Sequence, residues 1–453
     1  MEPEKKNDIE IKVYKGDKLF NQNTPFVINL FAPEAKEEDE QRVNADLICV
    51  IDISGSMDGQ KIHLVKESLK ILVDMMDPKD RIALVLFNQS AKLYYDLDYL
   101  SEKNKSHVKS LIDKIQANGG TNIASGLEVA IEILKKQKKN EKNEEERSSS
   151  VILLSDGRDN YMDDILLGEK LKSLTKGEGL SFTLNTFGYG YDHDPKIMNK
   201  LATLRDGSFF LVENYNKVGE YFVSVLGGCI SMVSKNAELD VKSINPNCKI
   251  VKVFGVNNLY SYEIKDLYFI NQMLQFIKGK DYTFVLELAL DESKIKPGDN
   301  LVQVTFNYID IITKEKKKID FLYEYALTDM NLPKANEEYI RSQTYEVLEQ
   351  ALKLKEEYKE DEAKKILKEM REWLEKNYKG ENKIYLEDIK KSEKMFENRY
   401  EFEQKACSYV TSQVRQMQSK RVGSITNYTN SVQKALQSNY VINFNQSIKN
   451  SKP

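Results

Sequence analysis

The pattern of hydrophobic and polar positions divides the chain into stretches with different periods. From residue 46 onward, short continuous apolar runs alternate with amphipathic helical patterns. The predicted strands are 47–51, 81–87, 151–154, 181–187 and 208–212, and the predicted helices are 60–76, 122–134 and 217–233. Continuous apolar runs are typical of strands buried on both faces, and intervening helices indicate parallel crossovers. We therefore predict an α/β domain with a doubly wound, mostly parallel sheet at 46–233.

A period of two replaces this pattern after residue 233. Alternating stretches occur at 237–244, 249–254, 282–288, 302–308 and 318–325. Such alternation is typical of strands with one buried face, so 234–332 is predicted to be an all-β, sandwich-like domain. Within residues 1–45, the segment 9–30 also alternates like two strands, which we expect to join this sandwich. The α/β domain would then be inserted into the sandwich.

Helical periodicity returns near residue 336. Residues 333–421 are predicted to form a helical hairpin followed by a long helix, because two apolar stripes flank a charged turn. Residues 422–453 are rich in Asn, Ser and Gln and are expected to be a flexible tail. Within the α/β domain, the polar stretch 135–150 is predicted to be an exposed loop.

Composition narrows the class of protein. Of the 453 residues, 41% are hydrophobic and 30% charged, which favours packed cores. The net charge of -4 gives no reason to expect nucleic acid as a partner. No apolar run has signal-peptide or membrane-helix length, so we expect a cytoplasmic protein without membrane insertion. Its four scattered cysteines are Cys49, Cys229, Cys248 and Cys407, and we predict reduced, buried thiols.

Three short polar segments carry the candidate chemistry. They are Asp52-Ile53-Ser54-Gly55-Ser56, Gly119-Gly120-Thr121 and Ser155-Asp156-Gly157. The first and third follow predicted buried strands, and the second opens a predicted helix, so all three are expected at the carboxyl edge of the sheet. They offer five oxygen-bearing side chains: Asp52, Ser54, Ser56, Thr121 and Asp156. Hard oxygen donors favour Mg²⁺, or Mn²⁺ or Ca²⁺, and two negative charges would leave the cation able to accept an acidic group from a partner protein.

DISGS, GGTNI and LLSDG resemble the metal-ion-dependent adhesion site of von Willebrand factor A domains, in the family's order. The resemblance implies that Ser54, Ser56 and Thr121 bind the metal directly, whereas Asp52 and Asp156 act mostly through waters. The segments 186–190, 192–194 and 207–209 are similar to the intracellular branch found in plant RING-type ubiquitin ligases. No RING signature accompanies them, so ligase activity is not transferred to this chain.

The same residues are also compatible with other interpretations. A degenerate domain that keeps the loops without metal would also contain these motifs. His193, between two aspartates, is interpreted as part of a polar turn rather than as a second metal site. Ser54 and Ser56 lack a GxSxG elbow and a placed histidine, and no Walker A or GxGxxG pattern opens a helix. We therefore expect no enzymatic activity.

The sequence predicts a scaffold that binds an Asp or Glu carboxylate of a protein partner through its metal. One alternative is a substrate-recruiting subunit of a ubiquitin-ligase complex. Another is a structural component of a large cytoskeletal or organellar assembly. A metal-dependent hydrolase is a further alternative, disfavoured because no general base accompanies the site. The pattern leaves the oligomeric state and the choice of cation open.

Overall fold

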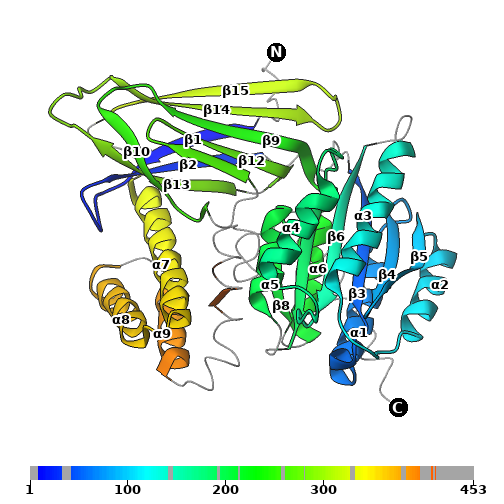
Figure 1. Cartoon of the computed structure of the whole chain (residues 1–453). Helices are drawn as coiled ribbons and strands as arrows, with labels where there is room; N and C mark the ends of the chain where they lie inside the picture. The colour runs from blue at the N-terminus through cyan, green and yellow to red at the C-terminus, as the bar shows by residue number, and fades with distance from the viewer. Residues whose placement is uncertain are drawn as a thin grey trace.

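Three β-sheets and a set of helices form the molecule (Figure 1). The computed structural model describes residues 9–32, 42–140, 146–190, 194–212, 215–256, 261–279, 281–326, 332–378, 384–397, 410–411 and 414. A six-stranded sheet and its helices make the α/β part. Two antiparallel sheets lie beside the α/β part and form a β-sandwich. A group of helices from the C-terminal part of the chain packs below this sandwich.

The α/β part contains the predicted sheet. Its strands lie in the order β5-β4-β3-β6-β7-β8, and every pairing is parallel except that of β4 with β5. The strands are β3 (Asn44–Asp52), β4 (Arg81–Phe87), β5 (Ala91–Tyr99), β6 (Arg147–Ser155), β7 (Thr183–Tyr189) and β8 (Phe209–Val212). The predicted α/β fold class is therefore confirmed, with β5 as an antiparallel edge strand that the pattern did not indicate.

Helices cover both faces of this sheet. They are α1 (Gln60–Met75), α2 (Glu102–Asp113), α3 (Ile123–Asn140), α4 (Asp164–Thr175), α5 (Pro195–Leu204) and α6 (Tyr215–Ile230). In β3, Leu47, Cys49 and Ile51 pack into the core under α1, α2 and α6. Ile48 and Val50 pack into the opposite core under α3, α4 and α5. Because both faces are covered, the strand ends are where a site can open to solvent.

The prediction that 135–150 form an exposed loop is wrong at both ends of this stretch. Helix α3 continues to Asn140, and β6 begins at Arg147, while 141–145 lie outside the described residues. Arg147 is buried because its Nε donates to Asp46 Oδ1 at 2.7 Å, and Arg81 Nε donates to the same oxygen at 2.8 Å. The polar residues at the start of β6 can therefore be buried, because their charged groups form ion pairs and hydrogen bonds within the protein.

The two antiparallel sheets enclose one core. Their orders are β1-β2-β13-β10 and β11-β12-β9-β14-β15. The strands are β1 (Glu10–Lys15), β2 (Thr24–Phe31), β9 (Met232–Ser243), β10 (Cys248–Val253), β11 (Ser261–Lys265), β12 (Tyr268–Ile277), β13 (Asp281–Leu290), β14 (Asn300–Asp310) and β15 (Lys316–Glu324). β2 pairs with β13, so the chain enters the sandwich before it forms the α/β part and returns to it at β9.

Three helices follow the sandwich: α7 (Leu332–Glu356), α8 (Glu360–Asn377) and α9 (Ile384–Glu397). They share a hydrophobic core, and α7 also packs on the sandwich through Tyr339 (Figure 1). Most of the predicted long helix after residue 397, and the predicted tail 422–453, lie outside the described residues.

Two further expectations concern membranes and cysteines. Among the described residues, no helix combines the length and apolar character needed to cross a bilayer. Cys49, Cys229 and Cys248 are buried free thiols, as predicted, and Cys407 lies outside the described residues. Burial raises the pKa of the Cys49 and Cys229 thiols to about 12, which keeps both protonated and unreactive.

Candidate metal site

The first predicted loop leaves the carboxyl end of β3 at Asp52. Both oxygens of this buried carboxylate are held: Oδ1 accepts from the Ser54 backbone N–H at 2.8 Å, and Oδ2 accepts from Ser155 Oγ at 2.5 Å. The turn that follows places Ser54 Oγ 3.1 Å from Ser56 Oγ. Two hydroxyls and a fixed carboxylate therefore gather within one short segment.

The second loop lies directly against the first. The Gly55 N–H donates to the Gly119 carbonyl at 2.8 Å, and the Asn118 N–H donates to the Ile53 carbonyl at 2.6 Å. A Cβ atom on Gly55 would lie 3.3 Å from the Gly119 carbonyl oxygen, closer than side chains normally approach. The glycine at position 55 thus allows two backbones to meet. Thr121, two residues beyond Gly119, is brought to the same edge of the sheet.

The third loop, which follows β6, is fastened to the second. The Thr121 N–H donates to Asn160 Oδ1 at 2.6 Å, and the Asn160 N–H donates to the Thr121 carbonyl at 3.0 Å. Asp159 Oδ2 accepts from the Ile123 N–H at 2.6 Å. Sequence reasoning did not single out Asp159 and Asn160, which lie two and three residues after LLSDG, because their contacts depend on how the loops meet. These two residues fix Thr121 relative to Asp156.

Asp156 provides the test of whether these residues suit a cation. Its side chain is fully buried, Oδ2 accepts from the Lys61 ammonium at 3.1 Å, and Oδ1 has no hydrogen-bond partner. The Thr121 hydroxyl likewise makes no hydrogen bond to the described part of the chain. A buried carboxylate oxygen without a partner is costly, and a bound cation would remove that cost.

The electrostatics point the same way. Burial, and to a smaller extent the charge of Asp156, raise the pKa of Asp52 to about 6, although hydrogen bonds from Ser155 and Ser54 lower it. Two carboxylates and one ammonium in a buried position favour additional positive charge. The donor set of two carboxylates and three hydroxyls suits Mg²⁺, Mn²⁺ or Ca²⁺, so the residues present fit a hard divalent ion.

The structure thus places all five predicted residues on three loops that are hydrogen-bonded to one another. Their role as metal ligands stays a prediction. The described ranges, this site included, contain no group of three or more His, Cys, Asp or Glu side chains arranged to hold a metal, and the candidate site combines two aspartates with three hydroxyls instead. His193, the other residue considered for metal, lies outside the described residues.

Comparison with known sequences identifies the domain that contains this site. Residues 46–223 match the family model of the von Willebrand factor type A domain. An uncharacterized protein of Synechocystis sp. is 27% identical over 62% of this chain and 65% of its own length. The inter-alpha-trypsin inhibitor heavy chain H2 of Sus scrofa is 30% identical over 41% of this chain. The chain spans less than two thirds of both relatives, and only 19% of the heavy chain.

Comparison with solved structures extends the similarity of fold to nearly the whole chain. A von Willebrand factor type A protein from Catenulispora acidiphila superposes with a TM-score of 0.66, covering 92% of this chain and 98% of that one, at 16% identity. The ArnB paralog VWA2 from Sulfolobus acidocaldarius gives a TM-score of 0.58 over 91% and 98%, also at 16% identity. At this identity the likeness concerns the fold alone. Family and fold agree that residues 46–223 of this chain form a von Willebrand factor type A domain.

Proposed function

We propose that the von Willebrand factor type A domain of this chain binds an acidic residue of a partner protein in a manner that depends on a divalent cation. Domains of this family are generally protein-interaction modules. One observation carries the proposal: the unpartnered Oδ1 of buried Asp156, on a loop fastened to the loops of the other candidate ligands.

The residues of the site have distinct tasks in this proposal. Asp52 is oriented by Ser155 and by the backbone of Ser54, so its oxygens keep one direction. Ser54, Ser56 and Thr121 add neutral oxygens, which limits the negative charge of the site to Asp52 and Asp156. A cation bound by only two carboxylates stays electrophilic and supplies a position for a carboxylate from outside.

The candidate site opens to solvent at a free end of the domain, where a protein partner can reach it. Gly55 and Ser56 are exposed, whereas Asp52 and Asp156 are buried beneath them. The opposite ends of the strands contact the sandwich, where Gln275 Nε2 donates to Ser148 Oγ at 3.1 Å. The candidate site therefore lies at the end of the domain that points away from the sandwich (Figure 1).

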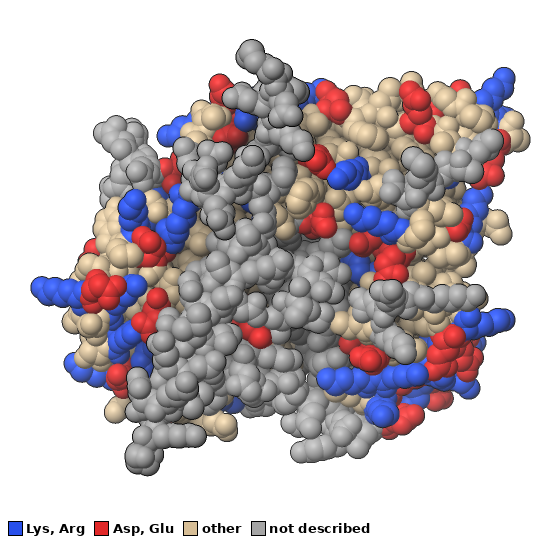
Figure 2. Space-filling model, turned by 180° about the vertical axis from the view of Figure 1, so that it is seen from behind, with Lys and Arg blue, Asp and Glu red and all other residues tan. Residues whose placement is uncertain are grey.

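The chain has no net excess of positive charge that would attract an acidic partner without a metal. Figure 2 shows acidic and basic side chains intermixed over the described part of one face of the molecule. The chain as a whole carries 67 Lys and Arg against 71 Asp and Glu. Attraction of an acidic partner would therefore be local to the site.

More specific roles stay predictions. Recruitment of substrate to a ubiquitin ligase and a structural place in a large assembly would each use the same site to hold a partner. The cytoplasmic location and the absence of catalysis are likewise predictions. The two binding roles differ in the partner that the site would hold.

The test is capture of peptides from a phage-displayed random library by the immobilised full chain. Peptides containing Asp or Glu should be enriched in Mg²⁺ and lost in a chelator. Thr121→Val should abolish this enrichment with little effect on stability, because the Thr121 hydroxyl makes no hydrogen bond to the described chain.

Thr203→Val is the matched control. The Thr203 hydroxyl is buried and has no hydrogen-bond partner in the described part of the chain, and it lies on α5, outside the proposed ligand set. This variant should enrich the same acidic peptides as the wild type. Equal capture of acidic peptides in chelator, or by Thr121→Val, would contradict the proposed function.

A further inference from the structure

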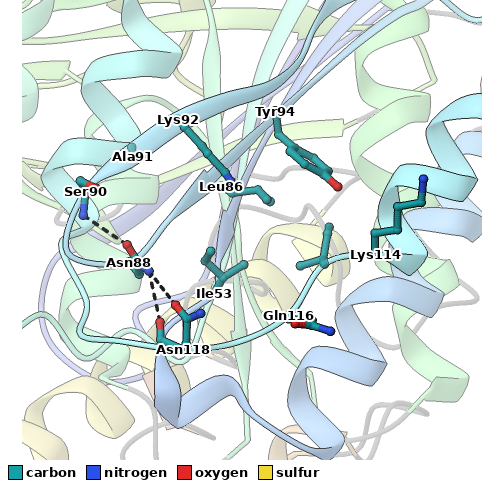
Figure 3. Close-up of a pocket in the computed structure, with 11 residues that line it drawn as sticks. Ile53, Leu86, Asn88, Ser90, Ala91, Lys92, Tyr94, Lys114, Gln116 and Asn118 are labelled. Carbon is teal, nitrogen blue, oxygen red and sulfur yellow. Dashed lines mark hydrogen bonds between the residues drawn. The ribbon is translucent and has the colours of Figure 1, made fainter.

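A cavity of about 390 Å³ borders the candidate metal site on the side of the β4–β5 hairpin (Figure 3). The loop after β3, the hairpin between β4 and β5, and the segment between α2 and α3 surround it. Its volume is at the lower end of the range for small-ligand pockets, which suits one side chain or a small molecule.

The chemistry of the lining is uneven. Ile53, Leu86 and Ile115 provide apolar surface, Lys92 and Lys114 are the charged residues of the lining, and no acidic residue lines the cavity. Figure 3 shows the Lys92 side chain extending toward Leu86. Within the described ranges of the chain, neither ammonium group forms an ion pair. The cavity is therefore suited to a group with a short apolar stem and a negative end.

The cavity and the metal site share a wall. Ile53 lies between the candidate ligands Asp52 and Ser54, and its carbonyl accepts from the Asn118 N–H at 2.6 Å. Asn118 immediately precedes Gly119, whose carbonyl accepts from Gly55. Asn88 Nδ2 donates to Asn118 Oδ1 at 3.0 Å and braces this wall from the β4 side (Figure 3). A peptide held at Ser54 and Ser56 would thus pass directly beside the cavity.

We propose that this cavity is a subsite for a second Asp or Glu side chain of the same protein partner. This inference rests on the proposed function, since the first acid is taken at the metal site. The recognised motif would then contain two acids: one for the candidate ligands, and one for Lys92 and Lys114. The apolar surface of Ile53 and Leu86 would contact the methylene groups of the second acid.

The experiment uses peptides that the wild-type chain enriches from the random library in Mg²⁺. Each peptide is synthesised with its acids intact and with each acid changed in turn to its amide. Affinities are measured for the full chain, for Lys92→Gln/Lys114→Gln, and for the control Lys103→Gln/Lys172→Gln. Lys103 and Lys172 are exposed lysines of the same domain outside the cavity lining.

The expected result is a double-mutant cycle with coupling. Removal of the second acid should weaken binding to the wild-type chain and to the control by about three- to tenfold, a typical range for two partly solvated ion pairs. The same removal should have no effect on Lys92→Gln/Lys114→Gln, which should bind both peptides with the weaker affinity. Both double variants should unfold at the same temperature as the wild type, because all four lysines are exposed.

The two proposals fail in different ways. Enriched peptides with a single acid, or a full response of Lys92→Gln/Lys114→Gln to removal of the second acid, would overturn the subsite while Mg²⁺ dependence persists. Binding that ignores Mg²⁺ and Thr121→Val, yet still depends on the two lysines, would overturn the metal-dependent function and show that the cavity takes an acid alone.

Discussion

Lys61 and Asp156 bring opposite charges together at the base of the candidate site. Lys61, in the first turn of α1, donates to Asp156 Oδ2 at 3.1 Å, and its side chain is only 19% exposed. A divalent ion that used Asp156 would enter next to this ammonium group. Lys61 therefore partly offsets the carboxylate charge when no metal is bound, and it should weaken the affinity for metal.

We predict that Lys61→Met binds Mg²⁺ about three- to tenfold more tightly than the wild type, because a nearby positive charge is removed. Calorimetric titration measures the change. Lys66→Met on the same helix is the control, since Lys66 donates to the Asp113 backbone carbonyl and not to a candidate ligand. Weaker Mg²⁺ binding by Lys61→Met would mean that the lysine supports the site.

At the residue scale, the five candidate ligands could be selected from the sequence because each lies in a short motif beside a predicted strand or helix. Lys61, Asp159 and Asn160 could not be assigned in the same way. Their contacts join separate loops: Asn160 bonds Thr121, and Asp159 bonds Ile123. Such contacts depend on how the loops meet in space, which periodicity does not specify.

Helix α3 is the element that positions Thr121, and its distance from the sheet depends on Gly126. A Cβ atom at this position would lie 2.7 Å from Val50 Cγ1 and 3.0 Å from Phe87 Cδ1, both in buried strands. Real side chains do not approach so closely, so α3 would have to move outward. The helix carries the glycine in its interior despite the poor helix propensity of that residue.

Gly126→Ala is predicted to lower the free energy of unfolding by about 1–3 kcal/mol through overpacking. Gly228→Ala on α6 is the matched comparison, since its Cβ would meet only Ile277 Cδ1 at 3.9 Å. It should raise stability by up to about 1 kcal/mol through helix propensity. Urea denaturation measures both. An equal effect of the two substitutions would contradict the packing argument.

Strands were predicted correctly where their residues are all buried and nearly all apolar. They were missed where polar residues are buried or apolar residues are exposed. β4 was predicted with its observed bounds because all its residues are buried. β5 was missed because its residues are mostly half-buried or exposed, and β12 because buried Asn271 interrupts its apolar positions. The start of β6 was missed because Arg147 is paired with Asp46, a contact between separate strands.

At the scale of the whole molecule, the carboxylate of Glu287 on β13 links the sandwich to the helical group. It accepts from Asn21 and Asn23 in the β1–β2 connection and from the Tyr339 hydroxyl of α7 at 2.8 Å. Burial, and secondly the hydrogen bond to Glu287, raise the pKa of Tyr339 well above its usual value, so the hydroxyl stays a donor. Segments from both ends of the chain thus meet at one buried group.

Tyr339→Phe should lower stability by about 1–3 kcal/mol, because one hydrogen bond to a buried carboxylate is lost. Hydrogen exchange should rise first in α7 and leave the α/β domain unchanged. Tyr358→Phe is the control, since the Tyr358 side chain is 88% exposed. Faster exchange throughout the chain would indicate that Glu287 supports the entire fold and not the junction alone.

The alternating patterns before and after the α/β domain suggested a sandwich built from both sides of it, and β2 does pair with β13. The order of the strands was beyond the sequence, because neighbours such as β9 and β14 are far apart along the chain. The helical hairpin followed from its apolar stripes. The packing of this hairpin on the sandwich through Tyr339 could not be predicted, because a single buried hydroxyl gives no periodic signal in the sequence.

The central claim is that three loops converge on one divalent ion, and calorimetric titration of the full chain with Mg²⁺ tests it most directly. The wild type and Thr203→Val should each bind one ion per chain with equal affinity. Thr121→Val should bind at least about tenfold more weakly while keeping its unfolding temperature. Unchanged Mg²⁺ binding by Thr121→Val, or no binding by the wild type, would contradict the account.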